Sequence, residues 1–140
     1  VEFGFYHGDF TPWNTVIENG KIKVFDFEYA KRTYPPYLDA VHYLLQKNFF
    51  VDGLNDANQI YSSLKESSIW KKFDDRRSLE MVIMYLLEII NLYLSRTSEE
   101  SLDEKSRQKI RIEILEKAVT EYANITRKRN LLRIADINDF

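Results

Sequence analysis

The chain has 140 residues with 22 acidic and 20 basic side chains, and its formal charge of -2 excludes the strongly basic surface that nucleic acid or an anionic membrane would require. It contains no cysteine, which excludes disulfides, thiolate metal sites and cysteine nucleophiles and fits a reducing, cytoplasmic compartment. With 44% hydrophobic residues it can bury one core, so we expect a single domain over residues 1–140.

The first 35 residues are rich in aromatic and β-branched side chains and predict strands and loops. Residues 14–18 and 21–27 flank the dipeptide Asn19-Gly20, which tolerates positive φ and favours a two-residue hairpin turn. Ile22 and Val24 alternate with lysines, as in a strand that is buried on one face. We therefore expect a β-hairpin with one apolar side.

After Pro35-Pro36, which stops any earlier helix, apolar residues recur at helical spacing. We expect four helices, at residues 38–50, 56–67, 75–95 and 101–127. The third is the expected core helix. Its most apolar run, residues 81–94, contains a glutamate and an asparagine and is too short to span a bilayer.

Two helix starts carry capping signals. Asn55 is expected to cap the second helix, and Ser101 to Glu104 has the form of a capping box for the fourth. The charged stretch at residues 105–111 is interpreted as a solvated face. The buried edge of the fourth helix is expected to consist of Ile110, Ile114, Val119, Tyr122 and Ile125.

The residues that carry chemistry lie in the first 28 positions. In a hairpin centred on Asn19-Gly20, Asn14 lies opposite Phe25 and beside Asp26. Side chains that are neighbours across strands are roughly 5 Å apart at Cβ, so the Asn14 amide oxygen and the Asp26 carboxylate can converge on one ion. Asp9 lies on the loop just before. Oxygen ligands of this kind suit Mg²⁺, and phosphate would complete its coordination.

The pattern His7-x-Asp9-x-x-x-x-Asn14 followed by Asp26-Phe27-Glu28 resembles the catalytic loop and metal-binding motif of the aminoglycoside phosphotransferase and choline kinase superfamily, relatives of the protein kinases. The resemblance implies an ATP-dependent kinase that transfers the γ-phosphate to a hydroxyl of a small molecule. Asp9 would be the catalytic base, with Asn14 and Asp26 as Mg²⁺ ligands. The implied fold is α+β and mainly α, a kinase-like C-terminal lobe with one β-hairpin that carries the catalytic loop and about four helices.

The same resemblance implies supporting roles for three further residues. Glu28 would assist the metal, His7 would support the loop without reacting, and Asp39 would open a helix and brace the loop by hydrogen bonds. His42, which lies among apolar neighbours, is interpreted as a satisfied helix histidine, and Trp13 as a packing residue.

The resemblance is specific over residues 5–30 and weaker over residues 37–40. Beyond residue 50 only the expected succession of helices is similar. The chain starts almost at the catalytic loop, so the glycine-rich loop, the strand lysine and the helix glutamate that hold ATP in such kinases are absent. We therefore expect a fragment that binds MgATP weakly and turns over slowly or not at all alone. Apolar surface where the missing lobe would dock predicts self-association.

Two other functions stay open. A non-catalytic, pseudokinase-like helical module would bind partners through its helices. A metal-dependent phosphoesterase uses similar ligands but needs further histidines or aspartates for a second metal. The sequence does not identify the acceptor of such a kinase. Aminoglycosides, choline, sugars and bacterial surface-carbohydrate precursors are all candidates, and we favour a carbohydrate-type alcohol.

Overall fold

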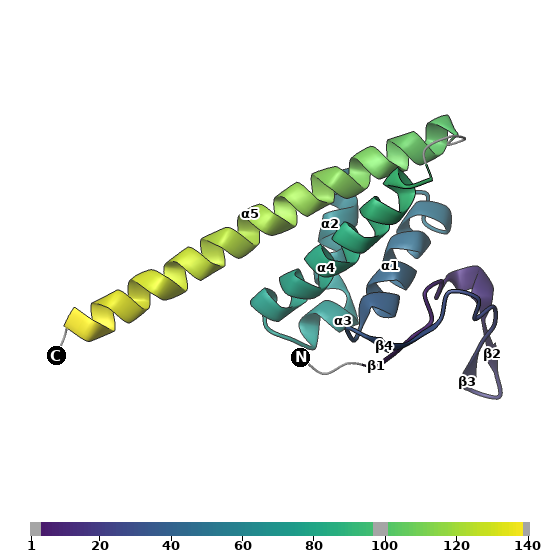
Figure 1. Cartoon of the computed structure of the whole chain (residues 1–140), viewed down its shortest axis with the longest axis horizontal. Coiled ribbons are helices and arrows are strands. Elements are labelled where there is room, and N and C mark those ends of the chain that lie inside the picture. The colour runs from purple at the N-terminus through teal and green to yellow at the C-terminus, as the bar shows by residue number, and fades with distance from the viewer. Residues whose placement is uncertain (1–3, 97–100, 139–140) are drawn as a thin grey trace.

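Two short antiparallel ribbons lie beside a group of packed helices (Figure 1). The computed structural model describes residues 4–96 and 101–138. The ribbons and their connection contain β1 (Gly4–Tyr6), a 3-10 turn η1 (Pro12–Asn14), β2 (Thr15–Glu18), β3 (Lys21–Val24) and β4 (Lys31–Tyr34). The helices are α1 (Leu38–Phe50), α2 (Ala57–Glu66), α3 (Ser68–Lys71), α4 (Asp75–Leu94) and α5 (Leu102–Asn138). The expected class, α+β and mainly helical, is confirmed.

The β2–β3 hairpin forms with the predicted register, since Thr15 pairs with Val24 and Glu18 pairs with Lys21. Asn19 and Gly20 have φ of 52° and 71°, the left-handed conformation that a two-residue turn of this kind requires. Local turn chemistry alone therefore sets the register of this ribbon.

The apolar side of the hairpin is not buried, so that part of the prediction is wrong. Ile17 is 79% exposed and Ile22 is 64% exposed. The reason is that the ribbon extends away from the helices, which leaves both of its faces open (Figure 1).

A second ribbon, which the sequence analysis did not predict, closes the N-terminal region. Strand β1 pairs antiparallel with β4, with Gly4 opposite Tyr34 and Tyr6 opposite Lys31. The chain between these strands makes the loop of residues 7–14, the hairpin and the return segment of residues 25–30. The closed ribbon thereby brings the two halves of the sequence motif side by side.

Helices α1 and α4 form where the periodicity predicts them. Leu38, Val41, Leu45 and Phe49 are buried along one stripe of α1, as expected. Helix α4 packs against both α1 and α5 and is the centre of the core (Figure 1). The most deeply buried apolar side chains of the core are Leu45, Ile60, Leu79, Tyr85, Leu86, Ile114 and Ala118.

The start of α2 differs from the prediction and α3 was not anticipated. Asp56, not Asn55, caps α2, because its Oδ1 accepts a hydrogen bond from Gln59 N at 2.9 Å. Ser67 then caps the single turn α3, which buries Trp70 in the core. A one-turn helix carries too few residues for a periodic signal.

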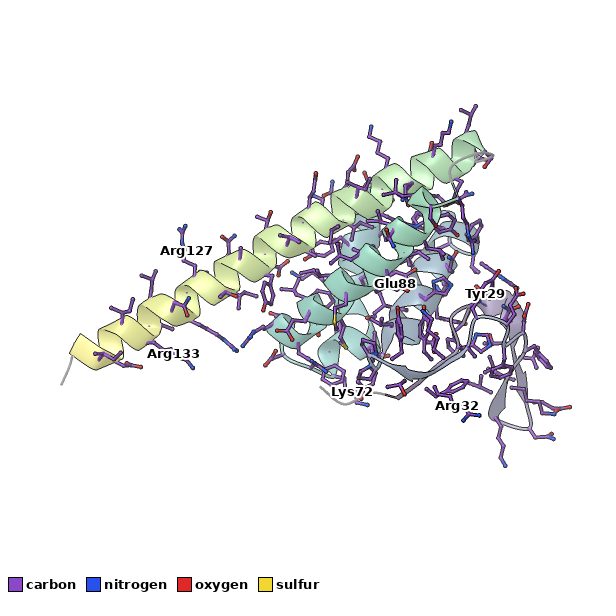
Figure 2. All side chains as sticks on the ribbon, viewed as in Figure 1. Tyr29, Arg32, Lys72, Glu88, Arg127 and Arg133 are labelled. Atoms are coloured by element: carbon purple, nitrogen blue, oxygen red, sulfur yellow. The ribbon has the colours of Figure 1, made fainter. Side chains whose placement is uncertain are left out.

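Helix α5 begins as predicted but runs to Asn138, well beyond residue 127. At its start, Ser101 Oγ accepts from Glu104 N at 3.2 Å, as in a capping box. Ala118 is fully buried where Val119 was expected, and Val119 is exposed. The far end extends past α4, with Arg127 and Arg133 projecting from it (Figure 2). No glycine or proline interrupts it, so the helix continues although residues 127–137 are all exposed.

The expected solvated face at residues 105–111 is wrong for two of its residues. Arg111 is 0% exposed and Gln108 is buried. Arg111 Nη1 donates to Glu104 Oε1 at 2.5 Å and to Gln108 Oε1 at 3.2 Å. Its guanidinium lies 4.4 Å from the ring centre of Tyr93 and 5.4 Å from that of Phe49. The polar stripe faces α4 because Glu104, Gln108 and Arg111 recur at helical spacing.

Among residues 4–96 and 101–138, no helix combines the length and the apolar character that a membrane crossing demands.

Truncation of Arg111 tests the buried polar stripe. Arg111→Ala leaves a cavity between two aromatic rings and removes the donor to Glu104, so we expect a loss of about 3 kcal/mol of unfolding free energy in urea denaturation. Arg107, which pairs with the same Glu104 at 2.9 Å but is partly exposed, is the matched control. Arg107→Ala should cost less than about 1 kcal/mol. Equal losses for the two variants would contradict the buried role of Arg111.

Candidate functional site

The loop that follows β1 is fixed to the first turn of α1 by Asp39. His7 N donates to Asp39 Oδ2 at 2.7 Å, and Gly8 N donates to Asp39 Oδ1 at 3.1 Å. Hydrogen bonds from backbone N–H groups to an ionised carboxylate are among the stronger ones in proteins. Asp39 thus makes the hydrogen bonds to the loop that its supporting role requires.

The His7 ring joins the loop to the return segment. Its Nε2 lies 2.9 Å from Phe25 O, and Asp9 N lies 3.2 Å from its Nδ1. A carbonyl can only accept and a backbone N–H can only donate, so the neutral ring carries its proton on Nε2. The ring is 3% exposed and packs against the edge of Phe27 at 4.6 Å between ring centres. Both ring nitrogens of His7 are thus used to hold the loop against the return segment.

Asp9 is held by one donor on each oxygen. Asn14 Nδ2 donates to Oδ2 at 2.9 Å, and His42 Nε2 donates to Oδ1 at 3.3 Å. The hydrogen bond from His42 holds the pKa of Asp9 below its ordinary value, against the raising effect of partial burial. Asp9 is therefore ionised at neutral pH and can accept a proton.

Behind Asp9 lies a buried donor chain. His42 is 4% exposed, and its Nδ1 lies 2.8 Å from the Tyr85 hydroxyl. Burial raises the pKa of Tyr85, so the phenol keeps its proton. Since His42 Nε2 must donate to the carboxylate, a neutral His42 accepts at Nδ1 from Tyr85. The chain from Tyr85 through His42 fixes the direction in which Asp9 points.

Asn14 is oriented with its amide oxygen turned away from Asp9. Its Nδ2 donates both to Asp9 Oδ2 and to Asp9 O, the latter at 3.1 Å. Its backbone N donates to Oγ1 of the fully buried Thr11 at 3.3 Å. Because both amide hydrogens are directed at Asp9, Oδ1 is the atom that can meet a ligand.

Asp26 and Glu28 stand apart from this network. Phe25 N donates to Asn14 O at 2.9 Å, so Asn14 and Phe25 are opposite, as predicted, and Asp26 follows. Asp26 is exposed and has φ of 61°, a left-handed conformation. Across residues 4–96 and 101–138, no three His, Asp or Glu side chains gather closely enough to hold a metal ion. The carboxylates of the motif are therefore not pre-assembled as a cage.

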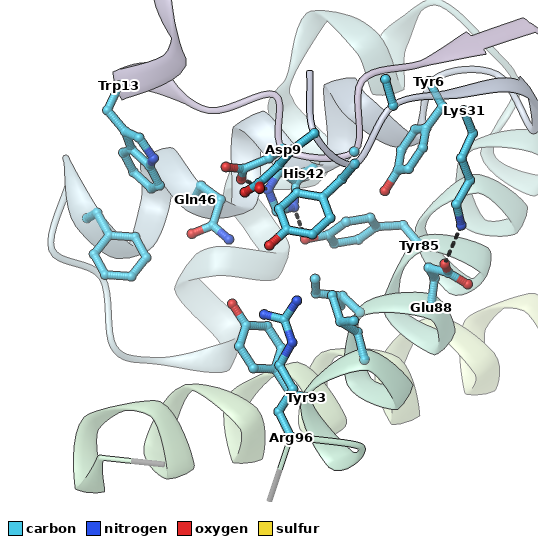
Figure 3. A pocket seen from close by; sticks show the side chains of 17 residues that line it. Tyr6, Asp9, Trp13, Lys31, His42, Gln46, Tyr85, Glu88, Tyr93 and Arg96 are labelled. Atoms are coloured by element: carbon cyan, nitrogen blue, oxygen red, sulfur yellow. Dashed lines mark hydrogen bonds and ion pairs between the residues drawn. The ribbon is translucent and has the colours of Figure 1, made fainter. Parts of the chain in front are cut away.

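Asp9 opens onto a cleft of about 640 Å³ between the loop, the return segment, α1 and α4 (Figure 3). Glu28 lines it as well. The side chains of Tyr6, Trp13, Tyr29, Phe50, Tyr85 and Tyr93 make its walls largely aromatic. Asn14 and Asp26 are not among the lining residues, so Asp9 is the motif residue that touches both Asn14 and the cleft.

Sequence reasoning did not assign His42, Gln46 or Trp13 to the site. His42 is a satisfied helix histidine as interpreted, but its partner is the candidate base itself. His42 and Gln46 line the cleft from the same face of α1 as Asp39, three and then four residues further along. Their helical spacing from Asp39 was the signal in the sequence that could have identified them as site residues. Trp13 packs against Phe50, with ring centres 5.4 Å apart, but it is 54% exposed and also lines the cleft.

No protein-family model matches this chain, and no curated protein and no solved structure shows significant similarity to it. The kinase-like resemblance therefore rests on the motif residues. What the site can do follows from its geometry, which is an ionised carboxylate oriented by an amide N–H and an imidazole N–H at the wall of an aromatic cleft.

Gly8 lies close to the backbone of the return segment, and its replacement tests the loop geometry. It has φ of 88°, and a Cβ there would lie 2.6 Å from Tyr29 O. Gly8→Ala should therefore separate the loop from the return segment and cost about 2 kcal/mol of unfolding free energy in urea. At Gly4 a Cβ meets nothing within 4 Å. Gly4→Ala is the control and should stay within about 0.5 kcal/mol of wild type. A neutral Gly8→Ala would contradict the close approach.

Proposed function

We propose that this chain carries the catalytic site of a phosphotransferase that moves the γ-phosphoryl group of ATP to a hydroxyl of a small molecule. The observation that supports this most is the state of Asp9. It is ionised, fixed by His42 on one oxygen and by Asn14 on the other, and it faces a cleft large enough for a small acceptor.

The chemistry assigned to Asp9 is proton acceptance. Each of its oxygens uses one lone pair for its protein donor and keeps another for an acceptor hydroxyl. As the hydroxyl proton passes to Asp9, the hydroxyl oxygen forms a bond to the γ-phosphorus, and the bond between that phosphorus and the leaving oxygen of ADP breaks. Positioning contributes most in phosphoryl transfer, so a carboxylate that is held rigidly at the cleft suits the reaction.

Asn14 and Asp26 are the residues that would hold Mg²⁺. Magnesium in phosphotransferases is bound by one or two carboxylates together with substrate phosphates, so a full carboxylate cage is not required. The free Oδ1 of Asn14 and the exposed Asp26 fit such a donor set. The left-handed backbone at Asp26 costs free energy, and strain of this kind collects at functional sites. The ion would neutralise phosphate charge, and Glu28 would assist from the cleft wall.

The nucleotide requires contacts beyond these residues. Phe5, Ile17, Phe25 and Phe27 are all more than half exposed, on or next to the two ribbons. Apolar surface of this kind marks a docking site. We assign it to a nucleotide-holding lobe, or to a second copy of the chain in the absence of that lobe.

One observation favours the alternative of a non-catalytic helical module. The end of α5 exposes four large apolar side chains, Leu131, Leu132, Ile134 and Ile137. A helix end that exposes several large apolar side chains suits the binding of another helix. The catalytic proposal and this alternative differ in whether nucleotide binds, which the second experiment below measures.

Asp9→Asn in the full-length protein tests the catalytic base. Asn keeps the size of the side chain and loses its capacity to take up a proton, so ATP-dependent phosphorylation of small alcohols should fall by about 10²- to 10⁴-fold. Release of ADP across a panel of acceptors is the readout, with circular dichroism to show that the fold is kept. Asp52→Asn, at an exposed carboxylate paired with Lys47, is the control and should leave the rate unchanged. A rate that survives in Asp9→Asn would sink the proposal.

Asp26→Asn tests the metal ligand without disturbing the backbone, because Asn tolerates the left-handed conformation as well as Asp does. MgATP should raise the melting temperature of the full-length protein, since a ligand that binds only the folded state stabilises it. We expect that rise to disappear in Asp26→Asn and when EDTA removes the metal. Glu66→Gln, at the exposed end of α2, is the charge-matched control. If MgATP gives no rise in wild type, the helical module is favoured instead.

A further inference from the structure

The two ends of the cleft differ in character, and Asp9 lies between them (Figure 3). At one end Lys31 Nζ lies 3.7 Å from Glu88 Oε1, so the charges there are matched. At the other end Trp13 and Phe50 meet edge to face with ring centres 5.4 Å apart, and both rings are about half exposed. The aromatic end therefore offers open apolar surface within the cleft.

Trp13 provides the more accessible of the two aromatic faces. The guanidinium of Arg107 lies 4.8 Å from the ring centre of Phe50 and covers part of that ring. Half-exposed tryptophan at the wall of a cleft is costly to hydrate and gains from stacking with a flat or ring-shaped ligand. Trp13 is thus the surface on which such a ring would pack.

Gln46 supplies an unused polar group at the same end. Its side chain lines the cleft and is 4% exposed, and its Oε1 has no hydrogen-bond partner within the part of the chain that the structure describes. Figure 3 shows the Gln46 amide between Trp13 and the pair of Asp9 and His42. A buried polar atom without a partner destabilises the free protein. A ligand hydroxyl can both donate to that oxygen and accept from the amide nitrogen.

The charges along the cleft argue against a highly charged ligand. Lys31 and Glu88 form an ion pair, and the other charged side chains that line the cleft, Asp9, Glu28 and Arg96, leave an excess of one carboxylate. A polyamine would require several unpaired acidic groups, whereas the cleft lining has an excess of one. A polyanion would require more than one unpaired cation. An aromatic face, an amide and a carboxylate together match the faces and edges of a hydroxylated ring.

We propose that the end of the cleft formed by Trp13, Gln46 and Phe50 is the acceptor subsite, and that it takes a neutral hydroxylated ring, a monosaccharide or a cyclitol. The ring stacks on Trp13, one hydroxyl bonds to the Gln46 amide, and another reaches Asp9. The role of Asp9 in this arrangement rests on the proposed phosphotransferase function, whereas binding of the ring to Trp13 and Gln46 does not.

The test measures ligand binding directly in the full-length protein. D-glucose, N-acetyl-D-glucosamine and myo-inositol are the neutral probes, and kanamycin and choline are the cationic ones. Thermal shift and saturation-transfer NMR report binding, and MgATP is added in a separate arm. The variants are Trp13→Ala and Gln46→Met, which keeps the length of the side chain. Leu87→Ala, at an exposed apolar residue of α4 outside the cleft, is the control.

We expect at least one neutral ring to bind wild type and Leu87→Ala, and to bind roughly tenfold more weakly to Trp13→Ala and to Gln46→Met. Without ligand, Gln46→Met should be as stable as wild type or more stable, because it removes an unpartnered buried oxygen. A merely structural Gln46 would instead give a less stable variant with unchanged ring binding, and that result would overturn the proposal.

Other outcomes separate the subsite from the phosphotransferase function. Selective binding of kanamycin or choline would overturn the neutral class, and ring binding that both variants leave intact would overturn the location. If MgATP binds but no neutral ring does, the subsite is wrong and the phosphotransferase function stands. If a neutral ring binds in a Trp13- and Gln46-dependent way and MgATP does not, the subsite stands as a carbohydrate-binding site and the phosphotransferase function fails.

Discussion

The two hydrogen bonds from His7 N and Gly8 N to the Asp39 carboxylate determine where everything else in the site lies. Asp39 is in the first turn of α1, where the helix dipole favours a negative charge. Its oxygens are occupied by the loop, and the helix start has no side-chain cap. Tyr37, the residue before the helix, has φ of 71°, a conformation that costs about 1 kcal/mol for a residue of its size. The connection of the loop to α1 therefore comes with a less stable start of the helix.

The consequence of that connection is that α1 presents a polar face to the loop and an apolar stripe to the core. His42 and Gln46 follow Asp39 on the polar face, at positions a purely structural helix would fill with apolar residues. Each brings a buried polar group, and Tyr85 from α4 completes the chain to Asp9. Residues that break the local rule of an apolar interior collect here, as expected where function rather than stability selects them.

Local sequence signals were enough to predict the secondary-structure elements, but not which side chains of those elements are buried. Asn19-Gly20 predicted the hairpin and its register, and the periodicity from Leu38 predicted α1, because these features depend on nearby residues. Exposure of Ile22 and burial of Arg111 depend on which element packs on them, and single-sequence periodicity does not contain that information. The pairing of Asn14 with Phe25 followed from the turn. The contact between Asp9 and His42 joins the loop to α1 and could not be predicted from the turn, because the two residues are far apart in the sequence.

Asp9 lies at the junction of two surfaces, and that position explains why the loop is held so firmly. Its Oδ2 faces Asn14, on the side proposed for the metal and phosphates, and its Oδ1 faces His42 at the cleft proposed for the acceptor. A displacement of about 1 Å between reacting groups can cost two orders of magnitude in rate. One carboxylate that serves both sides therefore has to be fixed from both. The bonds of His7 to Phe25 O and Asp9 N, with the close approach of Gly8 to Tyr29, hold the loop against the return segment, while Asp39 holds it against α1.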